Sequence, residues 1–586
     1  MTDNMDVLGE ALNRFSQIQS SQAFVRNQCN LDRRFYSVTG AQWEDGFCRG
    51  FDNKPRFEIN KIHLSIIRLI NEYRNNQVHV QFFADPLPDE MEQELADKIA
   101  ETCEGLLRAD EQDSDAYLAY TNGFEEAVGG GFGAFRLCAE YYDDEDDEDE
   151  RQKIKIQPIF DADISVYFDT DAKKQDKSDA RYCFVISTMS LEAYKQEYKD
   201  DPASWPSSIF NNTLGFARDY WITKDIVRIA EYYVLEKKTE TIRVFRGLLD
   251  DEVSYSDDDF EEDETLEEEL KSTGYTEVRR RKIKKNKVRK YILSAAKVLE
   301  DCGYLPGKHI PIIPVFGKRW YIDGVEHCMG HVRLAKDPQR LKNMQYSRLA
   351  EISALSPVEK PIFTPEQIKG FESMYRSDNV ENYSVMMVNL LKDPVGNLLP
   401  TQGPLAYTKP PSIPQATAAL LELTEMDIKD ILGNQQEGEK IMGGISGTVV
   451  EKIQEKIDAL AYIYLSNFAI AMKRCGEVWL EMAKELYFEP GRKMKTISKE
   501  GAQGTVQLYK STINKNGAIS YENDIKKARL TVQVEVGPSG TTKRQNIVKS
   551  LTGLMQYVQD PNEALVISLM AINNMDGDGL ADYRAY

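Results

Sequence analysis

The stretch TVVEKIQEKIDALAYIYLSNFAIAMKRCGEVWLEMAKELY, Thr448 to Tyr487, decides more about the fold than any other part of the chain. Its apolar residues follow the spacing of one very long amphipathic helix. At 1.5 Å per residue it extends about 60 Å, which predicts a spine longer than a compact enzyme usually needs. Its most apolar part, Ala459 to Met472, is shorter than the ~20 residues that span a bilayer, so we expect no membrane segment.

The residues before this helix predict a loop, a further helix and a connector. Asp430 to Gly447, DILGNQQEGEKIMGGISG, is polar and rich in glycine, which is typical of a loop. Ala416 to Leu432 has a helical pattern, and residues 392–416 are rich in proline and glycine, as in an extended connector. Val332 to Leu355 predicts another helix, which ends at Ser356-Pro357 because the residue before a proline disfavours the helical conformation.

The rest of the chain mixes helices and strands. Residues 1 to about 190 combine helical patterns, as in Ile59 to Asn76, with strand patterns, as in Gly129 to Tyr142. Ser190 is a candidate N-cap for a short helix, and Ile226 to Phe245 alternates like strands. A chain of 586 residues is too long for one hydrophobic core. We therefore expect an α+β multidomain protein.

Charge is distributed unevenly. The chain carries 95 acidic and 73 basic residues, for a net charge of −22, whereas a typical DNA reader is basic. Residues 143–150 are all acidic, and residues 257–269 carry ten acids. Contiguous acidic runs are usually solvated loops.

The opposite charge concentrates in RRRKIKKNKVRK, residues 279–290. This run either contacts phosphates or an acidic partner, or it pairs with the acidic run 257–269 across a hairpin or between subunits. Both interpretations remain open. Its candidate contact residues are Arg279, Arg280, Arg281, Lys282, Lys284, Lys285, Lys287, Arg289 and Lys290.

The sequence predicts no catalytic residues, no metal ligands and no cofactor. Gly307-Lys308 and Gly317-Lys318 lack the upstream glycine and the following Ser or Thr of a phosphate-binding loop. His327 and His331 match no strong zinc pattern, and a calcium-like turn starting at Asn574 ends on Ala585 instead of Glu. The eight cysteines are scattered, so we expect reduced thiols.

Several blocks resemble the portal proteins of short-tailed phages of the Salmonella podovirus type. They occur in the family's order and span most of the chain from about residue 130 to 540. The closest are DKSDARYCFVISTMS (176–190), HIPIIPVFG (309–317), VRLAKDPQRLKNM (332–344), KPIFTPEQIKGFESMY (360–375) and LPTQGPLAY (399–407). Weaker ones are GFGAFRL (131–137), IAEYYVLEKK (229–238), AMKRCGEVW (471–479) and VGPS (536–539).

This resemblance implies a portal fold of wing, helical stem, α/β clip and helical crown, assembled into a ring of twelve subunits. The ring is a non-enzymatic channel at one capsid vertex, through which double-stranded DNA is packaged and ejected. On that plan we expect 1–189 in the wing, 190–221 as a stem helix region, 222–330 as the clip, 331–356 as the second stem helix, 357–535 as the wing and channel region with the spine helix, and 536–586 as the crown.

The resemblance also implies partners and a location. The expected partners are further copies of the chain, double-stranded viral DNA, the large terminase subunit, capsid and scaffolding proteins, and tail adaptor proteins. The expected location is the portal vertex of the virion, after assembly in the host cytoplasm. The alternative is another virion ring or adaptor protein, which is usually much shorter.

Two further sets of residues follow from this resemblance as candidates. A channel-facing loop would contain Asn434, Gln435, Gln436, Glu437 and Lys440, although a surface turn explains the same residues. The second stem helix would present Arg333, Lys336, Gln339, Arg340 and Lys342. The basic run 279–290 would lie in the clip and serve ring or motor contacts.

Overall fold

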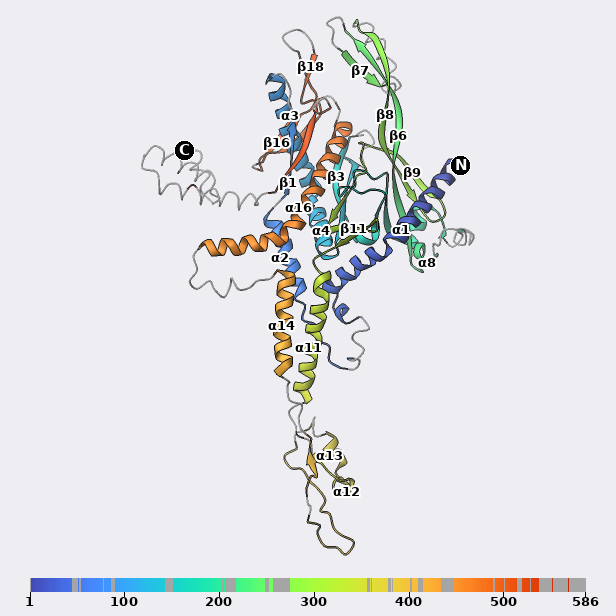
Figure 1. Cartoon of the computed structure of the whole chain (residues 1–586). Coiled ribbons are helices and arrows are strands. Elements are labelled where there is room, and N and C mark those ends of the chain that lie inside the picture. Colours follow the sequence, from blue (N-terminus) through green and yellow to red (C-terminus); the bar gives the residue numbers. More distant parts are fainter. Residues whose placement is uncertain are drawn as a thin grey trace. The chain divides into compact units, whose positions relative to one another are not determined.

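The computed structural model divides the chain into two units (Figure 1). Unit 1 comprises residues 1–34, 63–333 and 438–586, and unit 2 comprises residues 35–62 and 334–437. The structure describes residues 2–44, 51, 54–76, 78–85, 90–142, 151–202, 205, 218–247, 252–256, 274–355, 359, 361–377, 381, 383–400, 403–408, 415–433, 447–487, 489, 491–499, 501–513, 519–526, 529–536, 551 and 568.

The largest sheet of unit 1 is antiparallel and has six strands. Its order is β4-β5-β6-β8-β9, and β7 pairs with the end of β6. The alternation in the sequence around residues 226–245 forms one long strand here rather than several. The strands are β4 (Val166–Phe168), β5 (Tyr182–Ser190), β6 (Ile226–Arg246), β7 (Glu252–Ser256), β8 (Thr276–Leu293) and β9 (Val298–Leu305).

Both faces of this sheet are covered near its base, because successive side chains of a strand point to opposite sides. On one face Phe184 stacks on Tyr232 with ring centroids 4.6 Å apart, and Phe15 of helix α1 (Thr2–Ser37) packs on the pair. On the other face Val185 and Tyr233 belong to a separate buried cluster. The predicted strand residues of β5 and β6 therefore contribute to buried cores on both faces of the sheet.

A second sheet contains the strand that the sequence predicted within Gly129 to Tyr142. It has the order β10-β2-β3, with β2 (Phe132–Tyr141), β3 (Gln152–Ile159) and β10 (Ile312–Phe316), and helix α4 (Ala116–Gly129) packs on it. A Cβ at Gly133 would lie 2.1 Å from the carbonyl oxygen of Gly123, so helix and strand meet only because no side chain stands there. The acidic run 143–150 lies outside the described residues, between β2 and β3, which pair with Tyr141 opposite Gln152.

The predicted spine helix is confirmed as α16 (Gly447–Leu486). It packs against β10 and against the pair β1 (Val78–Ala84) and β19 (Leu530–Val536). Its buried side chains Phe468, Cys475 and Trp479 recur at helical spacing. In the described part of the chain, no helix is long and apolar enough to cross a membrane.

The remaining elements of unit 1 are shorter. Two helices flank the sheets, α3 (Glu90–Asp113) and α2 (Ile62–Asn75), whose first residue belongs to unit 2. Small helices are α5 (Ala162–Ser165), α6 (Leu191–Tyr198), α8 (Arg218–Trp221) and η4 (Arg333–Ala335), whose last two residues belong to unit 2. Hairpins are β11 (Lys318–Ile322) with β12 (Val325–Met329), β15 (Lys493–Ile497) with β16 (Gln503–Gln507), and β17 (Lys510–Ile513) with β18 (Ile519–Glu522).

Unit 2 is built on a pair of helices, α11 (Lys336–Leu355) and α14 (Gln415–Leu432), which pack side by side (Figure 1). Between them in the sequence lie β13 (Pro361–Ile362), which pairs with β14 (Ala406–Tyr407), and the helices α12 (Pro365–Ile368) and α13 (Glu372–Ser377). A 3₁₀ turn, η1 (Ala41–Trp43), precedes them in the chain.

The sequence did not predict that α11 packs on α14. Ser190 does cap α6, because its side chain accepts a hydrogen bond of 3.2 Å from the amide of Ala193. However, α6 has only eight residues and packs on β5 and β6, whereas α11 packs on α14. The expected crown, 536–586, lies almost wholly outside the described residues.

Candidate functional site: a basic β-ribbon

The basic run 279–290 lies on strand β8, and its outer part belongs to a two-stranded ribbon. Strand β5 accompanies β6 only as far as Val234, and β9 accompanies β8 only from Val288 onward. Residues 235–246 of β6 and 276–287 of β8 therefore extend beyond the buried sheet as a pair, joined near the tip by β7 (Figure 1). We call these two segments the basic ribbon. On β8 every residue of it is exposed or half-buried.

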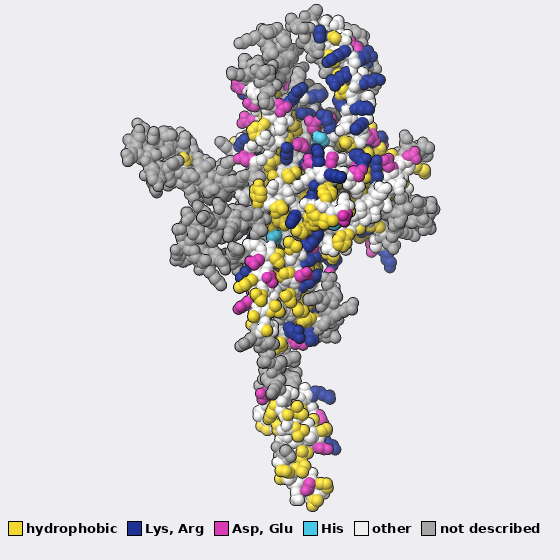
Figure 2. All heavy atoms as spheres, in the orientation of Figure 1, with side chains coloured by type: hydrophobic (Ala, Val, Ile, Leu, Met, Phe, Trp, Pro, Cys, Tyr) yellow, Lys and Arg dark blue, Asp and Glu magenta, His cyan; other side chains and the backbone are white. Residues whose placement is uncertain are grey.

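Strand register assigns the charges of the ribbon to its two faces. Cross-strand partners lie on the same face, and so do alternate residues along a strand. One face carries four successive partner pairs whose eight residues include five cations and no acid. These pairs are Lys237 with Asn286, Thr239 with Lys284, Thr241 with Lys282, and Arg243 with Arg280. Figure 2 shows Lys and Arg side chains following this ribbon.

Like charges stand directly opposite each other in two of the ribbon's pairs. Lys238 faces Lys285, and Arg243 faces Arg280. Directly opposed like charges destabilise a strand pair. Arg280 also contacts Glu277 on its own strand, with one nitrogen 3.1 Å from the carboxylate. A ribbon face with five cations and no acid is suited to an anionic partner.

At the base of the ribbon the charges are compensated within the chain. Arg289 donates to Asp301 at 2.5 Å, and Lys290 lies 3.3 Å from Glu231. Glu231 also forms an ion pair with Arg136, whose Nη1 lies 3.0 Å from Glu231 Oε2. Burial of Glu231 works to raise its pKa, but Lys290 and Arg136 outweigh burial and lower that pKa below its ordinary value. Arg289 and Lys290 thus hold the sheet together, and seven of the nine candidate cations lie on the ribbon itself.

The acidic run 257–269 lies outside the described residues, between β7 and β8. The ladder partner of the basic strand is β6. Strand pairing therefore leaves open whether the acidic run neutralises the ribbon.

The second candidate set, on and before α11, makes contacts within the chain. Arg333 lies in η4, where its Nε donates to the buried Asp32 at 2.7 Å. Lys336 and Arg340 lie over the ring of Phe35 at 5.4 and 5.2 Å. Gln339 and Lys342 are buried, and Lys342 Nζ lies 3.3 Å from Glu425. The loop residues Asn434, Gln435, Gln436, Glu437 and Lys440 lie outside the described residues.

Gln339 belongs to a polar ladder that the sequence analysis missed. Gln339, Asn343 and Ser347 accept hydrogen bonds of 2.9–3.1 Å from the backbone amides of Lys61, Ile59 and Phe57, respectively. Successive hydrogen bonds of this ladder lie four residues apart on the helix, a rise of about 6.0 Å, and two residues apart on the extended chain, a rise of about 6.6 Å. Because the two spacings nearly match, three such bonds form in a row. Polar residues spaced by four along one helix were the signal that could have revealed it.

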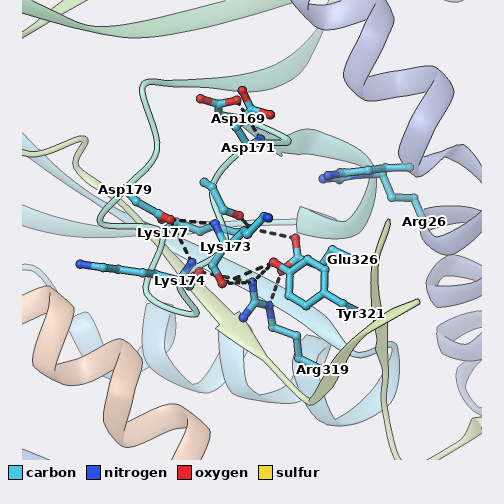
Figure 3. A network of polar contacts seen from close by, with 12 residues as sticks. Arg26, Asp169, Asp171, Lys173, Lys174, Lys177, Asp179, Arg319, Tyr321 and Glu326 are labelled. Atoms are coloured by element: carbon cyan, nitrogen blue, oxygen red, sulfur yellow. Dashed lines mark hydrogen bonds and ion pairs between the residues drawn. The ribbon is translucent and has the colours of Figure 1, made fainter. Parts of the chain in front are cut away.

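A polar network also orders residues 169–181, which overlap the first matched block at residues 176–181 (Figure 3). Lys177 donates to Glu326 of β12 at 2.8 Å and to the carbonyl of Ala172 at 2.7 Å. The carboxylate of Asp179 accepts from the amides of Lys173 and Lys174. These contacts fix the turn against the β11–β12 hairpin, which indicates a structural role for this block.

The histidines considered for zinc take part in packing. His327 stacks on Trp320 with ring centroids 5.8 Å apart, and His331 Nε2 lies 3.1 Å from the hydroxyl of Ser65. Among the residues that the structure describes, no group of three or more His, Cys, Asp or Glu side chains is arranged to hold a metal ion. The calcium-like turn near the C-terminus lies outside those residues.

Comparison with known proteins shows the family to which the chain belongs. The family model described as "Phage P22-like portal protein" matches residues 12–586. A protein named "Portal protein" from Acyrthosiphon pisum secondary endosymbiont phage 1 is 37% identical over 589 residues, which cover 98% of this chain and 79% of that relative.

Proposed function

Because this chain belongs to the phage P22-like portal protein family and is a phage portal subunit, we propose that twelve copies of it form a closed ring at one capsid vertex. The ring would be the channel for double-stranded DNA during packaging and ejection. It would dock the large terminase subunit first and tail adaptor proteins later. The observation that carries this proposal is the match over nearly the whole chain.

The net charge of −22 supports a conduit rather than a DNA-binding surface. Cationic rings would bind phosphates through counterion release and hold the DNA in place. A mostly acidic wall repels phosphate and lets the duplex slide. Capsid and scaffolding proteins would then hold the ring during assembly in the host cytoplasm.

The α11–α14 pair is the proposed helical stem, in place of the 190–221 and 331–356 pair that the sequence suggested. What supports it is that α11 and α14 pack on each other, whereas α6 packs on the large sheet. The clip was expected as the insert between the two stem helices. With this pair the insert becomes residues 356–414, which replace residues 222–330 as the proposed clip. The large sheet, with the basic ribbon, would then belong to the wing.

The basic ribbon is the proposed subunit contact within the ring. A ring built head to tail needs two different, complementary patches on every copy. This chain carries a cationic ribbon and two separate acidic runs, 143–150 and 257–269. Pairing the five-cation face of the ribbon of one copy with acidic residues of the next would bring opposite charges together. A motor contact by the same ribbon would involve terminase instead.

Negative-stain electron microscopy of the purified chain tests the ring. We expect top views with about twelve-fold symmetry and a central hole. A chain that stays monomeric at every concentration, even with scaffolding protein added, would contradict the proposal. The absence of ATP hydrolysis by the same sample would agree with a structural role.

Charge reversal tests the ribbon. The double variant Lys282→Glu with Lys284→Glu changes the exposed cationic face, and it should lose rings while keeping its circular dichroism spectrum. The matched control, Lys98→Glu with Lys318→Glu, changes two exposed lysines elsewhere by the same charge and should form rings as before. If the ribbon variant forms rings but fails to bind terminase, the ribbon is a motor contact. Normal rings and normal packaging would refute both roles.

A further inference from the structure

Two cysteines from distant parts of the sequence meet in the core of unit 1. Cys29 lies on α1 and Cys328 on β12, 299 positions apart, and their sulfur atoms are 3.6 Å apart. Both side chains are buried, at 1% and 7% exposure. Both are free thiols. The scattered spacing of cysteines in the sequence gave no indication of this pair.

The surroundings hold both cysteines in place. Arg333 donates through one nitrogen to the carbonyl of Cys328 at 3.0 Å, and another of its nitrogens lies 3.7 Å from the sulfur of Cys29. Its Nε is held by Asp32 at 2.7 Å. The sulfurs of a disulfide are about 2.05 Å apart, so the two sulfur atoms must approach by about 1.5 Å for the bond to form.

The two thiols differ in reactivity. The contact with Cys328 and the positive charge of Arg333 lower the pKa of Cys29, although burial opposes them. The same contact, together with burial, raises the pKa of Cys328. Because the thiolate is the nucleophile, Cys29 is the member that attacks first.

A small cavity borders both cysteines. Its volume is about 30 Å³, and its lining includes both cysteines, Arg26, Lys177 and Glu326. A buried water needs about 10–15 Å³, so about two waters fit, and hydrogen peroxide has a similar size. Figure 3 shows Lys177 and Glu326 directed toward each other. The rest of the lining is largely apolar and includes Phe132, Phe168 and Phe316, so the charged side chains are the groups that would hold a small polar reagent.

We propose that Cys29 and Cys328 form a redox modification site, which a small peroxide converts into an intrachain disulfide. The Cys29 thiolate attacks one peroxide oxygen, the O–O bond breaks, and a sulfenic acid and hydroxide form. The sulfur of Cys328 then attacks the sulfur of Cys29 and displaces the sulfenic oxygen as water, as the proton of Cys328 leaves. Overall, two thiols and one hydrogen peroxide give one disulfide and two waters.

The consequence of this step rests on the proposed function. A portal assembled in a reducing cytosol would carry both thiols, whereas a virion outside the cell meets oxidising conditions. The disulfide would tie the N-terminal helix to the hairpin that carries Cys328. Cross-links that close long loops restrict the unfolded chain most, so the link should stabilise the ring after assembly has finished.

The experiment compares full-length protein that is first reduced and then either kept reduced or treated with hydrogen peroxide. We expect a Cys29–Cys328 linked peptide by non-reducing mass spectrometry, and an unfolding temperature several degrees higher, reversed by a reductant. Cys29→Ser should abolish both effects. Cys302→Ser removes a half-buried thiol elsewhere and should leave both effects intact, which excludes exchange through Cys302.

Several outcomes would overturn the proposal. One is the absence of the linked peptide under conditions that oxidise Cys302 in the same sample. Another is a link that forms only after denaturation, or only between two copies of the chain. Ring formation, scored on the same samples, separates this inference from the proposed function: rings without the disulfide refute only the redox site, and a disulfide without rings refutes only the portal ring.

Discussion

Replacing Asp110 by asparagine should make the protein more stable at neutral and alkaline pH. Asp110 lies near the end of α3 inside the core, where its Oδ2 accepts hydrogen bonds of 2.8 Å from Trp479 and Tyr487. Burial raises the pKa of its carboxyl from 3.8 to about 7, although the two hydrogen bonds oppose the shift. Asparagine keeps an oxygen for both donors and has no charge to bury.

The linkage between proton binding and folding determines how Asp110 changes the free energy of unfolding with pH. Because the pKa of the folded state lies above that of the unfolded state, the folded protein binds the extra proton, and stability falls as pH rises between the two values. Each pKa unit corresponds to about 1.4 kcal/mol, so Asp110 should cost the wild type about 3 kcal/mol between about pH 5 and about pH 8. The Asp110→Asn variant would not suffer that loss, and at about pH 5, where Asp110 of the unfolded chain is already mostly ionised, the variant should already be more stable than the wild type by about 1–2 kcal/mol.

Urea unfolding followed by tryptophan fluorescence at both pH values measures the effect. Burial also raises the pKa of Glu111 and of Glu126 to about 7, so the wild type should lose stability at more than one site. These two groups are common to both proteins, and the difference between variant and wild type isolates Asp110. Asp337→Asn, at an exposed position, is the control and should change nothing. Equal pH dependence in wild type and the Asp110→Asn variant would refute the reasoning.

Three further predictions concern unit 2, the second sheet and the ring. Asn343→Ala leaves the amide of Ile59 without its acceptor and should lower stability by about 1–3 kcal/mol, measurable by thermal unfolding; an unchanged midpoint would dismiss the ladder. Gly133→Ala should prevent soluble folding because its Cβ meets Gly123, while Gly9→Ala, with nothing within 4 Å, should be neutral or stabilising by up to about 1 kcal/mol. Rings joined through the basic ribbon should dissociate as the salt concentration rises, because salt screens attraction between exposed charges. Light scattering measures the particle mass, and rings that persist at every salt concentration would argue for an apolar interface.

The sequence by itself determined the elements whose signal is local. The 40-residue spine appears within one residue of its predicted ends, since periodicity over many turns specifies a helix. The strand at β2 and the N-cap at Ser190 also follow from neighbouring residues alone. Family membership could be inferred for a related reason, because many short blocks in one order are specific even when each is weak.

Tertiary structure alone decided which distant segments meet. The strand register placed five cations on one face of the basic ribbon, and nothing within residues 279–290 identifies β6 as their partner. Likewise, α11 packs on α14, and Cys29 meets Cys328 across 299 positions. Periodicity and capping report on a residue's near neighbours, whereas these contacts depend on the packing of the whole core, to which every segment contributes.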